Sequence, residues 1–413
     1  MNILGFNPSH HGSVCLLQDG ELKYFIQEER IGNRKKYTGL PFKSFIDVLQ
    51  NYKLDFITWG TPSIEYNISN KTTSLFPYWQ SLAWSYHSEI RYYDFSPDFH
   101  HQLHAAHSFY NSGFKKCIGV IIDGCGSDVK LATDQNSPRT FVGQETETIF
   151  ECSYPFNFNV LFKNIFSSRA IPNLMFDEDL DSNARIHVPV PPKNVSITNH
   201  INLSRVYETV TMYLGWSRNE AGKTMGLAPY GKFNPTLPPF FQNKNGNPNV
   251  FFEDLKKHND PGSVPRAGEF LDSFINYKTN PQLKLQNDPK EWHYDESKIT
   301  DLEKDLAWKI QNDTQQLVGD YIEIAIEKTG LKQVCCAGGY FLNCVTNYYL
   351  VKRFPDIEFY FEPISNDAGT SIGAAKLVWH EKTQDTTIRP FKSLYLGKQY
   401  SKDELLKGIK KYT

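Results

Sequence analysis

Residues 117–126 read CIGVIIDGCG, and this short stretch decides the class of fold. Its apolar run has the length of one buried strand and ends at Asp123, directly before a turn that contains Gly124 and Gly126. Strands buried on both faces read as continuous apolar runs, and open α/β sheets bind their ligands beyond the carboxyl ends of such strands. The sequence therefore predicts an α/β fold with a site where this strand ends.

The sequence on both sides predicts further elements of the same kind. A first strand over residues 2–6 precedes a hairpin over 14–27, since Asp19-Gly20 between apolar runs is a strong hairpin signal. Helical spacing and short apolar runs predict helices over 42–50, 100–110, 299–328 and 365–377 and strands over 333–337 and 359–363. Strand–glycine turn–helix units at 118–128 and 333–350 indicate a fold built from two related halves.

Composition limits the class of protein. The chain has 413 residues, of which 40% are hydrophobic, so it can bury a large core, and its net charge of −2 argues against nucleic-acid binding by bulk charge. No apolar run approaches the roughly 20 residues of a membrane helix, and the N-terminus lacks a signal-peptide pattern. The seven cysteines form no CxxC pair, which predicts reduced thiols and a cytoplasmic location.

Four histidines fall within residues 100–107, and two of them have metal-ligand spacing. His100 and His104 stand four residues apart on a predicted helix and so share one face, with His107 near the same face. Most helices with this histidine spacing have a polar face that binds no metal. Asp123 and Asp367 each follow a strand, where an aspartate more often stabilises a turn than binds a ligand. A metal site here needs oxygen ligands from other parts of the chain.

Glycine turns and two polar segments complete the candidate sites. Gly124, Gly126 and the pair Gly338-Gly339 allow a phosphate to approach the backbone closely, and the occurrence of such turns after two strands of one chain supports this function. Residues 222–231 resemble neither a typical helix nor a strand, and their spacing is not that of a P-loop. His10 is equally a general base or a polar turn residue, and residues 27–36 are either a solvated strand end or a cationic patch for phosphate or carbamoyl oxygens.

Six segments occur together in the order found in one known family. They are ILGFNPSHHGSVCLLQDGELKYFIQEER (3–30), HHQLHAAHSFY (100–110), VIIDGCGSD (120–128), EAGKTMGLAPYG (220–231), AGGYFLNCVTN (337–347) and NDAGTSIGAA (366–375). Together they resemble the O-carbamoyltransferases of the NodU/CmcH type. The resemblance implies a Kae1-like α/β domain of the actin/Hsp70/sugar-kinase (ASKHA) class, with two ribonuclease-H-like halves. We expect this domain over residues 1–385, with insertions over about 135–205 and 232–296.

The resemblance also implies an activity and a set of site residues. Such enzymes make a carbamoyl-adenylate from carbamoyl phosphate and ATP and pass the carbamoyl group to an acceptor hydroxyl, with a divalent metal of the Fe²⁺ type. The implied metal ligands are His100, His104, Asp123 and Asp367. The implied catalytic residues are His10, as base, and Lys35. The implied nucleotide-binding residues are Gly124, Gly126, Lys223, Gly226, Gly338, Gly339 and Asn343.

The chain departs from the family's pattern in three places. His11 stands where the family usually has aspartate, and Asn33 where it has an arginine, a role that Arg34 can take. Members normally continue into a YrdC-like domain that makes the carbamoyl-adenylate, and residues 386–413 resemble a linker or the start of that domain. The resemblance therefore predicts that adenylation depends either on a YrdC-like domain beyond residue 413 or on a separate YrdC-like partner.

Several functions remain open at this stage. The acceptor is a natural-product sugar or a hydroxymethylated nucleobase or nucleotide, such as 5-hydroxymethylcytosine in DNA. A second enzyme class is tRNA threonylcarbamoyl transfer by a Kae1 homologue, which the near-neutral charge disfavours. A non-catalytic nucleotide-binding scaffold is a third reading, and the retained histidine and aspartate set argues against it.

Overall fold

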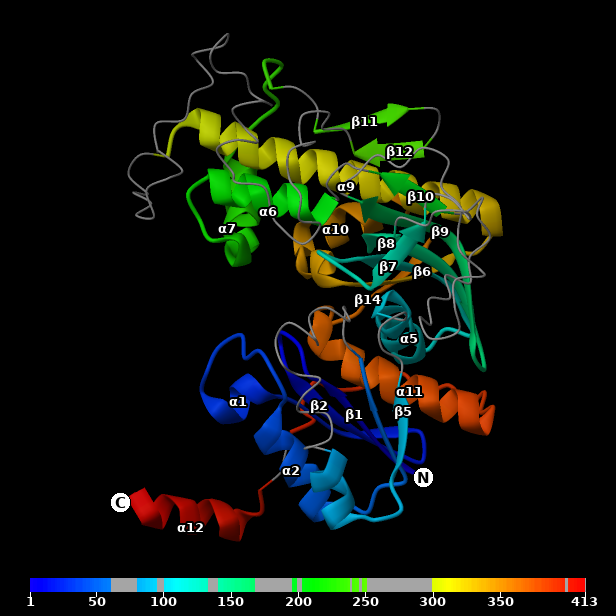
Figure 1. The fold of residues 1–413 in the computed structure, drawn as a ribbon. Coiled ribbons are helices and arrows are strands. Elements are labelled where there is room, and N and C mark those ends of the chain that lie inside the picture. The colour runs from blue at the N-terminus through cyan, green and yellow to red at the C-terminus, as the bar shows by residue number, and fades with distance from the viewer. Residues whose placement is uncertain are drawn as a thin grey trace.

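In a computed structural model, the described residues are 1–60, 80–94, 100–132, 140–167, 195–198, 203–237, 240–244, 247–250, 299–397 and 400–412. Two β-sheets lie one above the other with helices α5 (His100–Ser112) and α11 (Thr370–Thr383) between them (Figure 1). Further helices cover the outer face of each sheet. This layered α/β arrangement agrees with the fold class predicted from the sequence.

The first sheet is formed by the N-terminal part of the chain. Its five strands run in the order β3-β2-β1-β4-β5, with β1 antiparallel to β2 and parallel to β4. The hairpin predicted at Asp19-Gly20 is present, and both turn residues have positive φ. The strands are β1 (Asn2–Asn7), β2 (Ser13–Gln18), β3 (Glu21–Gln27), β4 (Phe56–Trp59) and β5 (Arg91–Asp94).

The second sheet contains the strand from which the fold was predicted. β6 is its central strand, antiparallel to β8 and parallel to β13, and the order is β10-β9-β8-β6-β13-β14 with β7 paired to β8. The strands are β6 (Lys116–Ile122), β7 (Asp128–Ala132), β8 (Thr140–Ser153), β9 (Asn157–Ser167), β10 (Val195–Thr198), β13 (Gln333–Ala337) and β14 (Glu358–Phe361). A separate hairpin joins β11 (Phe241–Lys244) and β12 (Asn247–Val250).

The two sheets repeat one topology. β9-β8-β6-β13-β14 has the same order and the same strand directions as β3-β2-β1-β4-β5. The signal used to predict two halves was nevertheless wrong. The units at 118–128 and 333–350 are built on β6 and β13, which are neighbours in the same sheet, with Val334 opposite Ile118. The other half is the N-terminal sheet.

Two sequence-based interpretations need correction. Residues 140–167, assigned to an insertion over the core, form strands of the second sheet itself: β8 pairs with β6, and β9 pairs with β8. Residues 221–230, read as neither helix nor strand, form helix α7 (Ala221–Leu227) and a following 3₁₀ turn. Residues 168–194 and 251–298, which make up most of the remaining predicted insertions, lie outside the described residues.

The helices divide between the layers. α5 packs on the second sheet and on α11, and α11 packs on the first sheet. A glycine permits the close approach of α11 to α5, because a Cβ at Gly373 would lie 2.0 Å from the carbonyl oxygen of Leu103 on α5. Other helices in the described residues include α1 (Glu28–Gly32), α2 (Phe42–Asn51), α6 (Leu203–Tyr213), α9 (Asp301–Thr329), α10 (Cys344–Arg353) and α12 (Lys402–Tyr412).

The apolar core follows the layers. One cluster lies between the second sheet and helices α6 and α9, another surrounds α5 and α11, and the third lies between the first sheet and α2. α5 and α11 are therefore held on all sides. This burial matters for function, because α5 and the turn before α11 present the polar side chains described next.

Candidate metal centre

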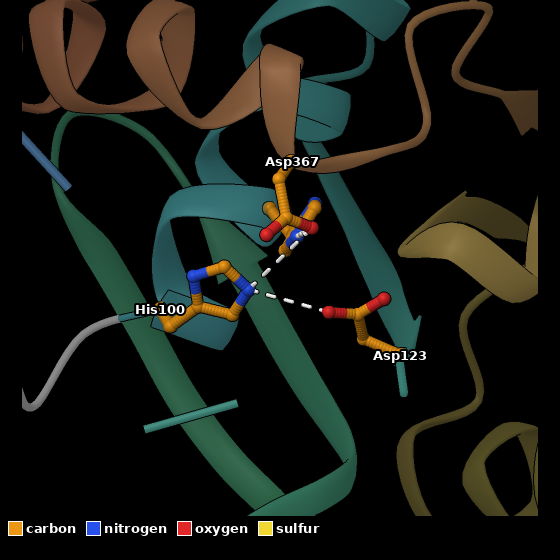
Figure 2. Close-up of side chains that lie close together, drawn as sticks. His100, Asp123 and Asp367 are labelled. Atoms are coloured by element: carbon orange, nitrogen blue, oxygen red, sulfur yellow. Dashed lines mark hydrogen bonds and ion pairs between the residues drawn. The ribbon is translucent and has the colours of Figure 1, made fainter. Parts of the chain in front are cut away.

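Four side chains from three separate elements meet between the two sheets. His100 and His104 come from the first turns of α5, Asp123 directly follows β6, and Asp367 begins the 3₁₀ turn η8 (Asp367–Gly369) that leads into α11. One ligand atom from each of these residues lies within 4.8 Å of the others, and all four residues are buried. Figure 2 shows one ring nitrogen of His100 facing both Asp123 and Asp367. The structure thus brings together all four metal ligands implied by the resemblance.

Local sequence explains how each ligand reaches this place. The i, i+4 spacing puts both histidines on one face of α5. The Ser127 hydroxyl, four residues after Asp123, accepts a hydrogen bond from His100 N at the start of this helix. The side chain of Asn366 accepts from Ala368 N and so caps the turn that carries Asp367. Thr370 Oγ1 and Asn7 Nδ2 both donate to the Asp367 carbonyl, which ties this turn to β1.

The distances within the cluster are those of a site without tight internal pairing. His100 Nε2 lies 3.3 Å from Asp123 Oδ2 and 3.9 Å from Asp367 Oδ1, and His104 Nε2 lies 3.7 Å from Asp367 Oδ1. The longer two exceed hydrogen-bond length. Within the described residues, neither ring nitrogen of His104 has a hydrogen-bond partner. Buried polar atoms are normally satisfied, so this set has the form of a ligand cluster.

The electrostatics favour ionised carboxylates. Burial alone would raise the pKa of Asp123, but the neighbouring His100 and His104 and the Gly339 N–H hold that pKa well below the ordinary value. Burial is likewise outweighed at Asp367, whose pKa is lowered chiefly by His10. Burial lowers the pKa of His104, which favours the neutral imidazole that can bind a metal. At His100, the two aspartates outweigh burial and raise the pKa.

The donor set fits a divalent transition metal. Two imidazoles and two carboxylates, all buried and drawn from three elements, match the nitrogen and oxygen ligands that iron(II) and similar ions take. The ring nitrogens of His104 point to the same use, since a metal would bind the lone pair of a buried nitrogen that no described side chain contacts by a hydrogen bond. A cation would also offset two buried negative charges. The residues present therefore fit the metal that the resemblance implies.

His10 lies at the open side of this cluster. Its Nε2 is 3.0 Å from Asp367 Oδ2, and its side chain is 50% exposed while Asp367 is 2% exposed. Asp367 thus faces the α5 histidines with one oxygen and His10 with the other. The adjacent His11 has a φ of 58°, and its pKa is lowered by burial and by His10. The pairing of His10 with Asp367 was not visible in the sequence, where the two are 357 positions apart.

Lys35 lies in an exposed loop that is attached to the His10 loop. Gly12 N donates to Tyr37 O at 3.1 Å and Gly39 N to Ser9 O at 3.2 Å, so the two loops run side by side. Neighbouring Lys36 reaches the second half of the molecule, with Nζ 3.4 Å from Asn219 O. The predicted cationic segment therefore borders the side on which His10 is accessible.

The predicted glycine turns differ in their surroundings. Gly338 has a φ of 98°, and a Cβ there would lie 2.2 Å from Ile122 O, so only glycine fits where β13 ends beside β6. The N–H of Gly339 donates to Asp123 Oδ1 at 3.0 Å. Gly126 N donates to Glu145 O at 2.8 Å within the sheet. Gly124 is half-exposed and lies beside the guanidinium of Arg205, a residue that sequence reasoning missed.

Three further predicted residues are not part of the cluster. Lys223 is half-exposed on α7 and pairs with Glu220 at 3.0 Å, and Gly226 faces open space on the same helix. Asn343 is buried at the start of α10, where its side chain accepts from Thr346 N and donates to Gln311 Oε1. The structure therefore gives Asn343 a helix-capping role.

The chain is similar to known proteins in sequence and in fold. A family model described as "Carbamoyltransferase N-terminus" matches residues 86–376. An uncharacterized protein of Synechocystis is 24% identical over 98% of this chain and 63% of its own length, and nodulation protein NolNO of Sinorhizobium fredii is 24% identical over 95% of this chain and 50% of its own. The solved structure of HypF from T. kodakarensis aligns with 94% of this chain and 49% of its own at a TM-score of 0.50 and 14% identity, a likeness of fold alone.

These relatives are longer than the chain. It spans between half and two thirds of the length of the two curated proteins. Among the described helices, none combines the length and apolar character needed to cross a bilayer.

Proposed function

The chain belongs to the carbamoyltransferase family, and from this premise we propose that it transfers a carbamoyl group to an acceptor hydroxyl at the centre formed by His100, His104, Asp123 and Asp367. The observation that carries the proposal is the convergence of these four buried side chains from α5, β6 and η8 beside a half-exposed histidine. The donor is carbamoyl-adenylate, derived from carbamoyl phosphate and ATP. The reaction takes place in the cytoplasm.

His100, His104, Asp123 and Asp367 would hold the metal, and iron(II) is the ion proposed for them. A bound divalent cation would polarise the carbamoyl carbonyl or offset the negative charge that develops on the departing phosphate. The surrounding protein keeps the ligands ready for this role, because all four are buried and hydrogen bonds hold the backbone of His100, the carboxylate of Asp123 and the turn that carries Asp367. Such pre-organisation removes reorganisation from the reaction step.

His10 would remove the acceptor's proton. Its Nε2 lies 3.0 Å from the buried carboxylate of Asp367, so Nδ1 is the nitrogen that would accept the proton, and its half-exposed ring can meet a hydroxyl from outside. The acceptor oxygen forms a bond to the carbamoyl carbon, the bond from that carbon to the AMP phosphate oxygen breaks, and the hydroxyl proton passes to His10. The products are the carbamate ester and AMP.

The phosphate of the donor would lie between the two halves of the molecule. Gly124 is half-exposed where β6 ends, and Lys35 stands in the loop that runs beside His10. A glycine turn admits a phosphate close to the backbone, and a lysine supplies a compact positive charge. We place the adenylate near α7 and the turn after β13, and assign Lys223, Gly226 and Gly338 to its surroundings.

The reaction itself is the direct test. The protein is incubated with Fe²⁺, ATP and carbamoyl phosphate, and with a panel of acceptors that includes aminoglycoside and oligosaccharide sugars and 5-hydroxymethylcytosine nucleotides. Mass spectrometry should find one acceptor class in which a carbamoyl group has replaced a hydrogen, with AMP released in equal amount. A parallel reaction supplied with a YrdC-like protein provides carbamoyl-adenylate independently of this chain. Absence of a carbamoylated product from every acceptor in both reactions would contradict the proposal.

Two variants separate metal binding from proton transfer. His100→Ala should remove both bound metal and carbamoyl transfer. His10→Ala should retain the metal and lose about 10²–10⁴-fold in turnover, the usual contribution of a general base. His380→Gln is the matched control, because it replaces a buried imidazole on α11 that bonds to Asp385 O away from the cluster. Metal content and transfer should both survive in this control.

A further inference from the structure

We propose that His107 and Glu362 form a buried positioning pair that sets the spacing between Asp367 and the α5 histidines, and thereby the metal affinity of the site. The inference rests on the metal centre of the proposed function. Neither residue belongs to the cluster of four ligands. Both are fully or almost fully buried, with exposed fractions of 0% for His107 and 2% for Glu362.

Glu362 is fixed by donors from three directions. It follows β14 and stands five residues before Asp367. Its carboxylate accepts hydrogen bonds from Asn111 Nδ2 at 2.9 Å, from the Tyr360 hydroxyl at 3.2 Å and from Ile364 N at 3.1 Å. Its Oε1 also lies 3.2 Å from His107 Nε2. A carboxylate held at this many points has one position, so it can serve as a fixed reference for the imidazole beside it.

His107 connects Glu362 to the turn that contains Asp367. It stands three residues after His104, on the face of α5 that also bears the two histidine ligands. Its ring packs directly against Gly369, where a Cβ would lie 2.1 Å from the ring carbon Cε1. Gly369 is the last residue of η8, two positions after Asp367. The imidazole therefore lies between the fixed carboxylate of Glu362 and the backbone of the ligand-bearing turn.

The same network reaches the helix after this turn. Lys376 on α11 is buried, and its Nζ donates to Asn111 Oδ1 at 2.7 Å, while Asn111 donates to Glu362. Burial lowers the pKa of Lys376 to about 8. α5, the segment after β14 and α11 are thus joined by polar contacts next to the metal cluster. Three of the four proposed ligands lie on the elements so joined.

Stability alone does not explain this network. Buried charged groups are costly, and apolar side chains of the same volume generally stabilise a core equally well or better. Residues behind metal ligands, by contrast, fix ligand orientation, and their loss typically weakens metal binding by 10–100-fold. The position of His107 between Glu362 and Gly369 is that of a residue that fixes the orientation of metal ligands.

Glu362→Gln is the principal test, with Co²⁺ as the probe. The amide places an N–H₂ group where donors from Asn111, Tyr360 and Ile364 converge, so the side chain must move and His107 with it. We expect the Kd for Co²⁺, measured by calorimetry, to rise by about 10–100-fold. The visible absorption of bound Co²⁺, which reports ligand geometry, should change as well. A role in stability alone would leave both quantities unchanged.

Glu303→Gln provides the matched control. Glu303 is a buried carboxylate at the start of α9 that accepts hydrogen bonds from Thr300, so its loss also weakens a buried polar contact. This control should lower the melting temperature and keep the wild-type Co²⁺ Kd and spectrum. His107→Gln is the second variant, used in case Glu362→Gln fails to fold. It keeps a polar side chain beside Glu362 but removes the ring that packs on Gly369, and the Co²⁺ Kd should again rise.

The outcomes separate this inference from the proposed function. Wild-type Co²⁺ affinity and spectrum in the folded variants would overturn the positioning role and leave the metal site intact. Absence of Co²⁺ binding by the wild-type protein would overturn both proposals. Weakened Co²⁺ binding in the variants, together with no carbamoyl transfer by the wild type, would support the positioning role and contradict the proposed reaction.

Discussion

Gly373→Ala should damage stability and metal binding together, because Gly373 on α11 lies directly against the backbone of α5. A Cβ at this position on α11 would lie 2.0 Å from Leu103 O on α5, and real Cβ atoms essentially never come within 3.0 Å of a heavy atom. The helices must therefore separate by about 1 Å, whereas protein–metal distances tolerate changes of only about 0.2 Å. α5 bears His100 and His104, and Asp367 begins the short turn that leads into α11. Separating the two helices therefore increases the distance between Asp367 and the two histidines.

The expected cost is about 1–3 kcal/mol of unfolding free energy, the usual penalty for extra volume in a packed core. The Co²⁺ Kd should rise at least about tenfold, as when ligand orientation is disturbed. Urea unfolding followed by circular dichroism and calorimetric Co²⁺ titration measure the two effects. Gly222→Ala on α7 is the control, because no atom lies within 4 Å of the added Cβ, and it should stabilise the helix by about 0.5–1 kcal/mol. Wild-type stability and Co²⁺ affinity in Gly373→Ala would refute the described contact between α5 and α11.

Three further predictions concern buried ionisable groups and thiols. Lys163→Met should cost about 3–5 kcal/mol in urea unfolding, because it leaves the buried Glu145 carboxylate without its cation. Burial opposes the effect, but Lys163 lowers the pKa of Glu145 to about 2 from 4.5, so the pair's stabilisation is present above pH 4.5 and is lost as the pH falls towards 2. In that variant the melting temperature should therefore fall less steeply as the pH is lowered from 4.5 towards 2. An unchanged pH dependence would contradict the stabilising role of the Lys163–Glu145 pair. Burial lowers the pKa of His380 to about 4 from 6.5, so the unfolded chain binds more protons and stability falls as the pH drops through this range. His380→Gln should remove that part of the pH dependence of the melting temperature. Among the seven cysteines, Cys344 is exposed and five are buried, so a thiol reagent should modify one site rapidly, and Cys344→Ser should abolish this rapid phase.

Much of the fold could be predicted from local pattern. The first strand, the Asp19-Gly20 hairpin, the helix starting at His100 and the long helix over 301–329 agree with the structure because each has its own periodicity or turn signal. β8 and β9 were not predicted because polar residues interrupt their apolar residues, so neither segment has a continuous apolar run. α7 was missed because its glycines and small residues weaken the helical pattern, although neighbouring elements support it.

The candidate site divides in the same way. The sequence by itself determined the residue types and spacings: an HxxxH pair on one helix face, an aspartate after the strand CIGVII, and the motif order that identified the family. Only the tertiary structure decided that Asp123 and Asp367 meet those histidines, that His10 faces Asp367, and that Glu362 stands behind His107. The physical reason is that periodicity reports only contacts a few residues apart. Contacts between distant segments depend on how the two sheets pack against α5 and α11.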